Sequence, residues 1–225
     1  MNQTSLRVFI TCIGISVLLV GILTSAFAQG HQTSRELDAK VEAFLDGNRR
    51  NWHGWNVSYE DGKVLYNLIV KNSYRRALEI GTSTGHSSIW IAWALSKTGG
   101  KLTTIEIDES RYRTALMNFK KAGVEGLIDA RLADAHQLVK ELKGPFDFVF
   151  SDADKEWYTQ YFKEVEPKLV VGGCFTAHNV MDGFGGVKEF LDYIRSLPHY
   201  QTTIDHSSSS GISISYKKSI TLSSQ

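Results

Sequence analysis

Short apolar runs and amphipathic stretches take turns along the chain from residue 76 onward. Five apolar runs have the length of strands and end in glycine or polar residues: 77–81, 102–107, 130–133, 146–151 and 174–177. Between and after them, apolar residues recur at helical spacing in residues 87–96, 109–122, 135–142, 158–169 and 186–196. Because strands joined by helices need right-handed crossovers, this pattern predicts a parallel sheet covered by helices on both faces.

The end of the chain departs from this alternation. Residues 202–206 and 211–216 both have the pattern of strands, but only residues 207–210 separate them, too few for a crossover helix. We therefore expect an antiparallel hairpin at this end of the sheet. The predicted fold class is α/β, with a doubly wound, mostly parallel seven-stranded sheet that ends in an antiparallel hairpin. Two amphipathic helices, at 35–45 and 61–70, precede it.

The first 28 residues differ in character from the rest. Arg7 is their only charge, residues 8–23 are apolar, and Ala26-Phe27-Ala28 has the small-x-small pattern of a cleavage site. This combination predicts a secretory signal peptide, hence export to the periplasm or the medium, with residues 29–225 as one domain. The alternative is an uncleaved membrane anchor through residues 8–23, although this stretch is shorter than the roughly 20 residues that span a bilayer. In both cases the leader is the only expected membrane contact.

Composition narrows the class of partner. The chain has 225 residues, of which 42% are hydrophobic and 22% charged, with a net charge of +1, as in an ordinary soluble domain. No basic block marks a nucleic-acid surface, so a small molecule is the expected partner. Of the two cysteines, Cys12 lies in the leader, which leaves Cys174 alone and excludes an intramolecular disulfide in the mature chain.

A glycine turn and an acid indicate a nucleoside site. The first predicted strand ends at Gly81, and Gly85 precedes the next helix, so a ligand can approach bare backbone near the helix N-terminus. Glu106 stands at the end of the second strand, where a carboxylate can accept hydrogen bonds from both hydroxyls of a ribose. Glycines alone would indicate only a turn, but together with Glu79 and Glu106 they favour nucleoside binding.

These features resemble the class I S-adenosylmethionine (SAM) methyltransferases, and in particular the small O-methyltransferase family that contains catechol and caffeoyl-coenzyme A O-methyltransferases. The resemblance covers nearly all of the chain after residue 28 and is carried by residues 56–57, 61–63, 78–87, 105–107, 133–136, 148–158 and 172–180. It implies a Rossmann-like methyltransferase domain, SAM as cofactor, and methyl transfer to a hydroxyl of a small aromatic, catechol-like acceptor.

The resemblance also implies which residues hold the cofactor. They are Asn56, Val57, Glu79, Gly81, Ser83, Ser87, Glu106, Ile107, Asp134, Ala135 and His136. Asp134 has a second interpretation, because aspartate is also a good cap for the helix that begins at Ala135.

Catalysis and metal binding are implied for the segments after the fourth and fifth strands. By resemblance, Asp152 and Lys155 are catalytic, and Asp152, His178 and Asn179 bind a divalent cation. Such a cation would activate and fix the acceptor hydroxyl, and Lys155 could accept its proton.

The family usually has aspartate at position 178, and an imidazole there disfavours Mg²⁺ or Ca²⁺. Imidazole suits zinc, iron, manganese or nickel, so we expect retained metal binding, with the identity open among Mg, Mn, Zn and Fe. The alternative is a metal-free site with His178 as general base.

Other functions and partners stay open at this point. A NAD-dependent dehydrogenase shares the sheet and the ribose acid, but it is disfavoured because the turn lacks the third glycine of Gly-x-Gly-x-x-Gly. An exported, non-catalytic nucleotide-binding protein is the other alternative, since SAM is made in the cytosol. Trp52, Trp55 and Trp157 either wall an aromatic acceptor pocket or pack in the core. A homodimer through the N-terminal helices is possible.

Overall fold

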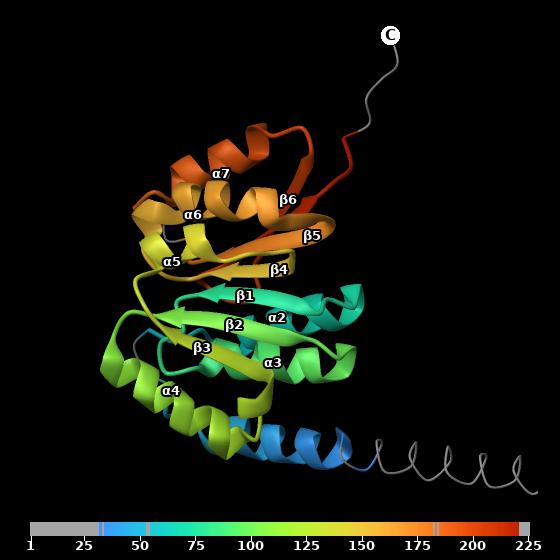
Figure 1. Ribbon diagram of the computed structural model, residues 1–225, viewed down its shortest axis with the longest axis vertical. Helices are drawn as coiled ribbons and strands as arrows, with labels where there is room; N and C mark the ends of the chain where they lie inside the picture. Colours follow the sequence, from blue (N-terminus) through green and yellow to red (C-terminus); the bar gives the residue numbers. More distant parts are fainter. Residues whose placement is uncertain (1–31, 33, 53–54, 182, 184, 221–225) are drawn as a thin grey trace, which may run out of the picture. The chain divides into compact units, whose positions relative to one another are not determined.

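The computed structural model describes residue 32 and residues 34–52, 55–181, 183 and 185–220 (Figure 1). The predicted signal peptide, its cleavage site and the alternative anchor lie outside these residues. The chain divides into two compact units, Met1–Lys40 and Val41–Gln225. In the first, residues 34–40 are helical, and the helix continues to residue 47. In the part that the structure describes, no helix is both long and apolar enough to cross a membrane.

The second unit is built on a mixed sheet that confirms the predicted fold class. Within the described residues it has seven strands in the order β3-β2-β1-β4-β5-β7-β6 (Figure 1). The strands are β1 (Arg76–Ile80), β2 (Lys101–Glu106), β3 (Ile128–Leu132), β4 (Phe146–Ser151), β5 (Leu169–His178), β6 (Tyr200–Asp205) and β7 (Ile212–Lys217). The first five are parallel, and β7 lies antiparallel between β5 and β6, as the short connection predicted.

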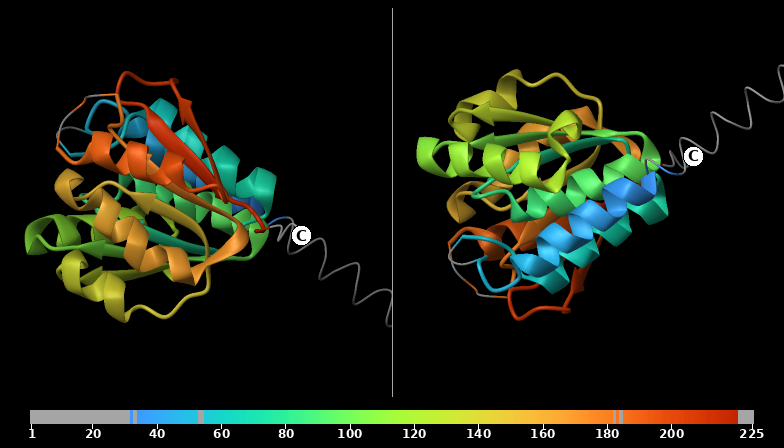
Figure 2. Two further views of the ribbon diagram at one scale, coloured as in Figure 1. Left: turned by 90° about the horizontal axis from the view of Figure 1, so that it is seen from above. Right: turned by 90° about the horizontal axis from the view of Figure 1, so that it is seen from below.

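Helices cover both faces of this sheet. They are α2 (Tyr59–Asn72), α3 (His86–Thr98), α4 (Glu109–Ala122), α5 (Ala135–Glu141), α6 (Tyr158–Val165) and α7 (Val187–Ser196), with short 3-10 turns at Glu125–Leu127, Lys155–Trp157 and Glu166–Lys168. Figure 2 shows α2 and α3 on one side of the sheet and α6 and α7 on the other. Every predicted strand and helix of this unit is present, with shifts at the ends.

Alternation along the strands supplies the two hydrophobic cores. Successive side chains of a strand point to opposite faces. Leu78 and Ile80 of β1 pack in the core beneath α5, α6 and α7, whereas Ala77 packs in the core beneath α2 and α3. Phe148 and Phe150 of β4 join the second core and are fully buried, so the central strands are held from both sides.

The ends of β1 and β4 meet closely, which places the residues that follow them side by side. Gly81 has a φ of +102°, and a Cβ there would lie 2.8 Å from the carbonyl oxygen of Asp152. The Asp152 N–H donates to the Ile80 carbonyl at 2.8 Å. Only glycine allows this approach without strain, so Gly81, directly after β1, lets the backbone of Asp152 lie this close.

Candidate active site

A cavity of about 280 Å³ opens where β1, β2 and β4 end. Of the residues predicted to hold a cofactor, those that line it are Gly81, Ser83, Glu106, Ile107, Asp134, Ala135 and His136. Asp152 lines it too, so the predicted nucleoside site and the predicted catalytic carboxylate share one space. Ligands of doubly wound sheets bind at this edge, outside the carboxyl ends of the strands.

Glu106 is fixed at the end of β2 by three N–H donors. Its Oε2 accepts the Ser83 N–H at 2.7 Å, and its Oε1 accepts the Asp108 N–H at 2.9 Å and Arg111 Nε at 3.2 Å. The carboxylate is 5% exposed and faces the cavity. It therefore ties the turn after β1 to the start of α4. We did not predict the contact of Arg111 with Glu106, although a cation in the first turn of the helix that follows Glu106 was a usable signal for it.

Asp134 caps α5 as one of its two interpretations predicted, and its contact with the cofactor stays a prediction. Its Oδ1 accepts the His136 N–H at 2.9 Å, which caps α5, and the residue also lines the cavity. His136 lies nearly parallel to Tyr161, with 5.7 Å between the ring centroids. Tyr161 and Asp154 line this part of the cavity as well, and the sequence analysis missed both.

Four predicted cofactor contacts lie, among the described residues, outside the cavity lining: Asn56, Val57, Glu79 and Ser87. The Asn56 amide donates to Thr84 Oγ1 at 2.9 Å, and the Val57 carbonyl contacts His86 Nδ1 at 2.9 Å. These contacts hold the segment before α2 against the turn after β1. Their role in cofactor binding stays a prediction.

Glu79 and Ser87 belong to the interior. Glu79 is fully buried and accepts hydrogen bonds from Ser88 and, at 2.6 Å, from Thr104. Burial raises its pKa to about 7, although the surrounding hydroxyl donors lower it. Ser87 is buried in the first turn of α3. Glu79 therefore joins β1, β2 and α3, and a cofactor contact from this position is not part of the described geometry.

The two predicted catalytic residues are in direct contact. Lys155 Nζ donates to Asp152 Oδ1 at 2.6 Å. Lys155 opens the 3-10 turn after β4, and its side chain is 26% exposed, whereas that of Asp152 is 11% exposed. The spacing of three residues on a tight turn thus brings a cation next to Asp152, the carboxylate that lines the cavity.

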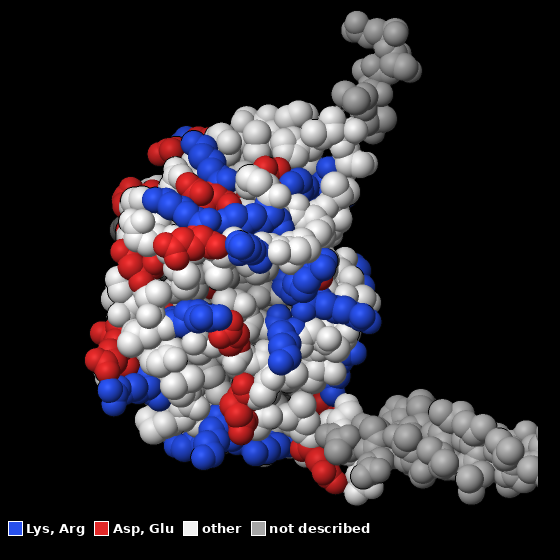
Figure 3. All heavy atoms as spheres, in the orientation of Figure 1, with Lys and Arg blue, Asp and Glu red and all other residues white. Residues whose placement is uncertain are grey.

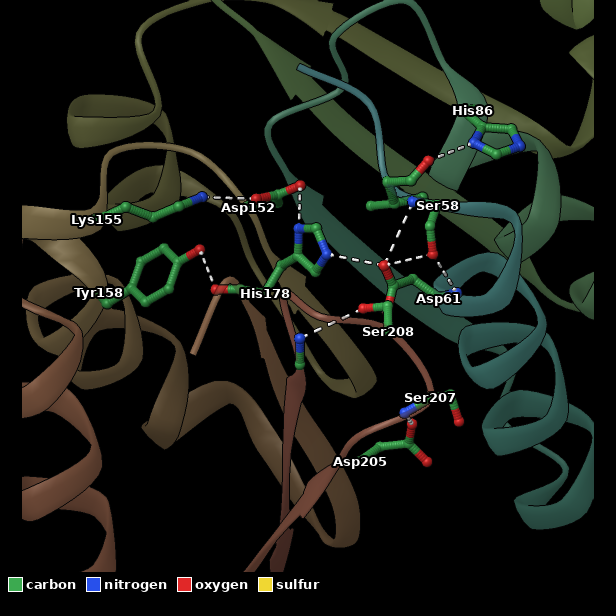
Figure 4. Close-up of polar contacts among 12 residues, drawn as sticks. Ser58, Asp61, His86, Asp152, Lys155, Tyr158, His178, Asp205, Ser207 and Ser208 are labelled. Carbon is green, nitrogen blue, oxygen red and sulfur yellow. Dashed lines mark hydrogen bonds and ion pairs between the residues drawn. The ribbon is translucent and has the colours of Figure 1, made fainter. Parts of the chain in front are cut away.

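His178 ends β5 and lies between two carboxylates (Figure 4). Its Nδ1 is 3.1 Å from Asp152 Oδ2, and its Nε2 is 3.1 Å from Asp61 Oδ2. Burial alone would lower the pKa of His178, but the charges and hydrogen bonds of Asp152 and Asp61 outweigh it and raise the pKa to about 9. The reciprocal interactions hold the pKa of both carboxyls below their usual range, against the effect of burial.

Asp61 reaches this cluster from the first turn of α2. It forms a capping box with Ser58, in which each residue's side chain bonds the other's backbone N–H. Ser208, in the loop between β6 and β7, donates to Asp61 Oδ1 at 2.7 Å (Figure 4). The sequence analysis placed Asp61 at the start of the predicted helix 61–70 and among the residues that carry the family resemblance, with no role in the active site. Its pairing with His178, 117 residues away, had no local signal.

The three predicted metal ligands do not form a metal site in this arrangement. Both ring nitrogens of His178 face carboxylate oxygens at 3.1 Å, so neither is directed at an open coordination position. Asn179 follows with a φ of +56°, and no group of three His, Cys, Asp or Glu side chains among the described residues converges as an ion requires. The donor set therefore does not fit a divalent cation, and no step of the reaction is derived through one.

Comparison with known proteins establishes the family. The O-methyltransferase family model matches residues 32–196. The chain belongs to this family. The resemblance read from the sequence motifs is thereby confirmed, and the catechol and caffeoyl-coenzyme A enzymes named in it recur among the relatives of this O-methyltransferase family member.

Its curated relatives match over part of their length. A catechol O-methyltransferase of Niastella koreensis is 41% identical over 130 residues, which are 56% of this chain and 58% of the relative. A caffeoyl-CoA O-methyltransferase of Medicago sativa is 32% identical over 164 residues, 70% of this chain and 64% of the relative. The chain thus spans about three fifths of these proteins.

Solved structures of the family have the same fold. The O-methyltransferase of Bacillus cereus, in complex with SAH (S-adenosylhomocysteine), superposes with a TM-score of 0.68 at 29% identity, covering 80% of this chain and 91% of that one. The O-methyltransferase TomG of Streptomyces achromogenes, in complex with SAM, superposes with a TM-score of 0.69 at 27% identity, covering 80% and 90%.

Proposed function

We propose that the protein transfers a methyl group from SAM to a hydroxyl of a small aromatic, catechol-like acceptor. The observation that carries this proposal is the cavity that both Glu106, fixed at the end of β2, and Asp152 line, with Lys155 paired to Asp152. Similar chains of the same family have been crystallised with SAH or SAM, which supports the choice of cofactor.

Glu106 is the proposed ribose acceptor. A carboxylate has about four lone-pair sites, and three of them already receive protein N–H groups. One ribose hydroxyl can therefore add to Oε2, and the second can replace Arg111, whose side chain is 36% exposed and free to extend into solvent at low cost. The exposed side chain of Ile107 and the segment from Ala133 to His136 provide the walls for the adenine.

The reaction asks mainly for orientation. The acceptor hydroxyl loses its proton to solvent water, and the resulting phenolate oxygen forms the new bond to the methyl carbon. The methyl–sulfur bond breaks, and its electron pair stays on sulfur. Holding the two reactants in line supplies much of the rate enhancement. Lys155, oriented by Asp152 at 2.6 Å, is proposed to hold the phenolate oxygen through its ammonium group until the new bond forms. As an ammonium donor it cannot also be the proton acceptor that the resemblance implied.

Aromatic side chains at the cavity favour an aromatic acceptor. Trp55 lines the cavity and is 80% exposed, so its indole face is available to stack on a phenol ring. Trp157 packs against His136, with 4.1 Å between the ring centroids. Trp52 instead stacks on His86 at 4.5 Å and has a packing role, so of the three predicted tryptophans Trp55 is our choice for the acceptor wall.

Calorimetry and product analysis test this function. The full-length protein is titrated with SAH and, separately, with NAD⁺; we expect one SAH per chain and no heat from NAD⁺. It is then incubated with methyl-labelled SAM and a dihydroxy aromatic, and mass spectrometry should find the label on the acceptor oxygen. SAH binding without transfer would favour the non-catalytic alternative, and NAD⁺ binding without SAH binding would overturn the proposal.

We further propose export by residues 1–28, on the pattern of the leader alone. N-terminal sequencing of the protein from its producing cells should find Gln29 as the first residue. An intact N-terminus in the membrane fraction would favour the anchor through residues 8–23 instead.

Lys and Arg are interspersed with Asp and Glu over the visible face in Figure 3, in keeping with a small-molecule partner.

A further inference from the structure

We infer that His178, held between Asp61 and Asp152, is an internal cation that takes the place of the predicted divalent metal, and that Asp61 is a positioning residue of the acceptor site. This inference deepens the proposed function and rests on it. Asp61 itself is not among the residues lining the cavity, so it acts through His178 and Asp152.

The hydrogen bonds of Asp61 identify it as an ionised acceptor. Ser58 Oγ accepts the Asp61 N–H at 3.0 Å, so its own hydroxyl hydrogen is directed at Asp61 Oδ2, 2.8 Å away. The Ser58 N–H approaches the same oxygen at 3.3 Å, and Ser208 donates to Oδ1. Because a carboxylate only accepts, the Nε2 of His178 must donate to it.

The other ring nitrogen meets the same constraint. Asp152 Oδ1 receives Lys155 Nζ, an ammonium that has only donors, and Asp152 Oδ2 lies 3.1 Å from His178 Nδ1. With both of its nitrogens donating, the ring carries two N–H groups and a positive charge. This conclusion follows from the geometry of the four side chains (Figure 4).

The cluster is balanced in charge without a metal. Two carboxylates, Asp61 and Asp152, are matched by two cations, His178 and Lys155, and Asp61 and His178 are only 1% and 5% exposed. Removing the partner of a buried carboxylate strongly destabilises the folded protein, because the charge that remains is uncompensated. A divalent ion at this place would have to displace the imidazolium from both carboxylates, so we expect the wild-type protein to work without one.

The chain of contacts explains why Asp61 matters to the reaction. Asp61 fixes one side of the His178 ring, and the ring then fixes Oδ2 of Asp152. The other oxygen of Asp152, which itself lines the cavity, is left to hold Lys155. The capping box of α2 and the loop between β6 and β7 both converge on Asp61, so elements far from the cavity determine the direction of the ammonium group.

Manganese binding tests the metal part directly. Mn²⁺ is added to the full-length protein saturated with SAH, and the free ion is followed by electron paramagnetic resonance. We expect the wild type to leave the Mn²⁺ signal unchanged, and a chelator to leave turnover unchanged. Uptake of one Mn²⁺ per chain, lost in Asn179→Ala, would overturn the inference. Absence of SAH binding in the same sample would instead contradict the proposed function.

Nitrogen NMR tests the imidazolium without any variant in the active site. Protein labelled with ¹⁵N-histidine should show one buried ring with both nitrogens protonated, and Mn²⁺ should not broaden its signals. If every buried histidine ring had one unprotonated nitrogen, the inference would be contradicted. It would also be contradicted if Mn²⁺ broadened the signals of the doubly protonated ring.

Asp61→Asn tests the positioning role, with Glu60→Gln as the matched control. Glu60 is the neighbouring acid on α2, and its side chain is 52% exposed. We expect Asp61→Asn to lower kcat about tenfold to a hundredfold, the factor for loss of a charged hydrogen bond, while KM and SAH affinity stay within about twofold. An unchanged kcat, or an equal loss of SAH affinity, would contradict the role. If the variant does not fold, the NMR measurement decides.

Discussion

Replacing Glu106 by glutamine removes its charge while keeping its shape. The carboxylate now accepts N–H groups from Ser83 at 2.7 Å, Asp108 at 2.9 Å and Arg111 at 3.2 Å. In the variant, an amide NH₂ must face at least one of these donors, whichever way the amide is turned. The hydrogen bonds to the ribose lose their charge assistance as well.

The magnitude follows from these contacts. A hydrogen bond to a charged group contributes about 1.5–3 kcal/mol, and each 1.4 kcal/mol is a factor of ten in Kd. We therefore expect Glu106→Gln to raise the Kd for SAH about tenfold to a hundredfold. Arg111 should compensate little, because it is a donor and cannot replace the lost acceptor.

Isothermal calorimetry of the full-length protein with SAH measures this effect. Glu109→Gln is the matched control, because Glu109 begins α4 near Glu106 but is 62% exposed and paired only with Arg113 in the ion pairs described. The control should leave Kd unchanged. If Glu106→Gln retained wild-type affinity while its thermal unfolding was also unchanged, the assignment of Glu106 to the ribose would be refuted.

Three further outcomes follow from the same geometry. Asp152→Ala should abolish methyl transfer and leave the SAH affinity within about twofold, as measured by calorimetry and product formation, because it orients Lys155 at the reacting centre. Gly81→Ala should lower the free energy of unfolding in urea by about 1–3 kcal/mol, since φ is +102° and the new Cβ meets the Asp152 carbonyl; an unaffected midpoint would contradict this. The pKa of His178 is raised from 6.5 to about 9, so its contribution to stability is fully present below pH 6.5 and lost as the pH rises through about 9. The difference in urea stability between wild type and His178→Gln should shrink over that range, and a constant difference would speak against the paired imidazolium.

Local pattern was enough to predict the order and type of the elements in the second unit. The terminal hairpin followed from a connection too short for a helix, and β7 indeed pairs with β5 and β6. The sequence pattern predicted the end of α6 less accurately. We expected a helix to residue 169, but α6 ends at Val165 and β5 already begins at Leu169. Pro167 has no backbone N–H to continue the hydrogen bonds of the helix. Gly172 and Gly173 within β5 concealed its first half, since they break the apolar run.

The residues of the site also divide into those that the local sequence could predict and those that it could not. Gly81, Glu106 and Asp134 each end or follow a strand, so their place at the cavity could be read from short stretches of sequence. The pairing of Asp61 with His178 joins α2 to the end of β5 and exists only in the folded chain. A histidine in place of the expected aspartate was visible in the sequence, but the carboxylates on both of its nitrogens were not.

A crystal structure of the protein with SAH tests the central claim most directly. Adenosine should fill the cavity at the ends of β1 and β2, with both ribose hydroxyls on Glu106 and the sulfur facing Asp152 and Lys155. An SAH molecule bound elsewhere, or a Glu106 still fully paired with Arg111 and out of contact with the ribose, would contradict the account.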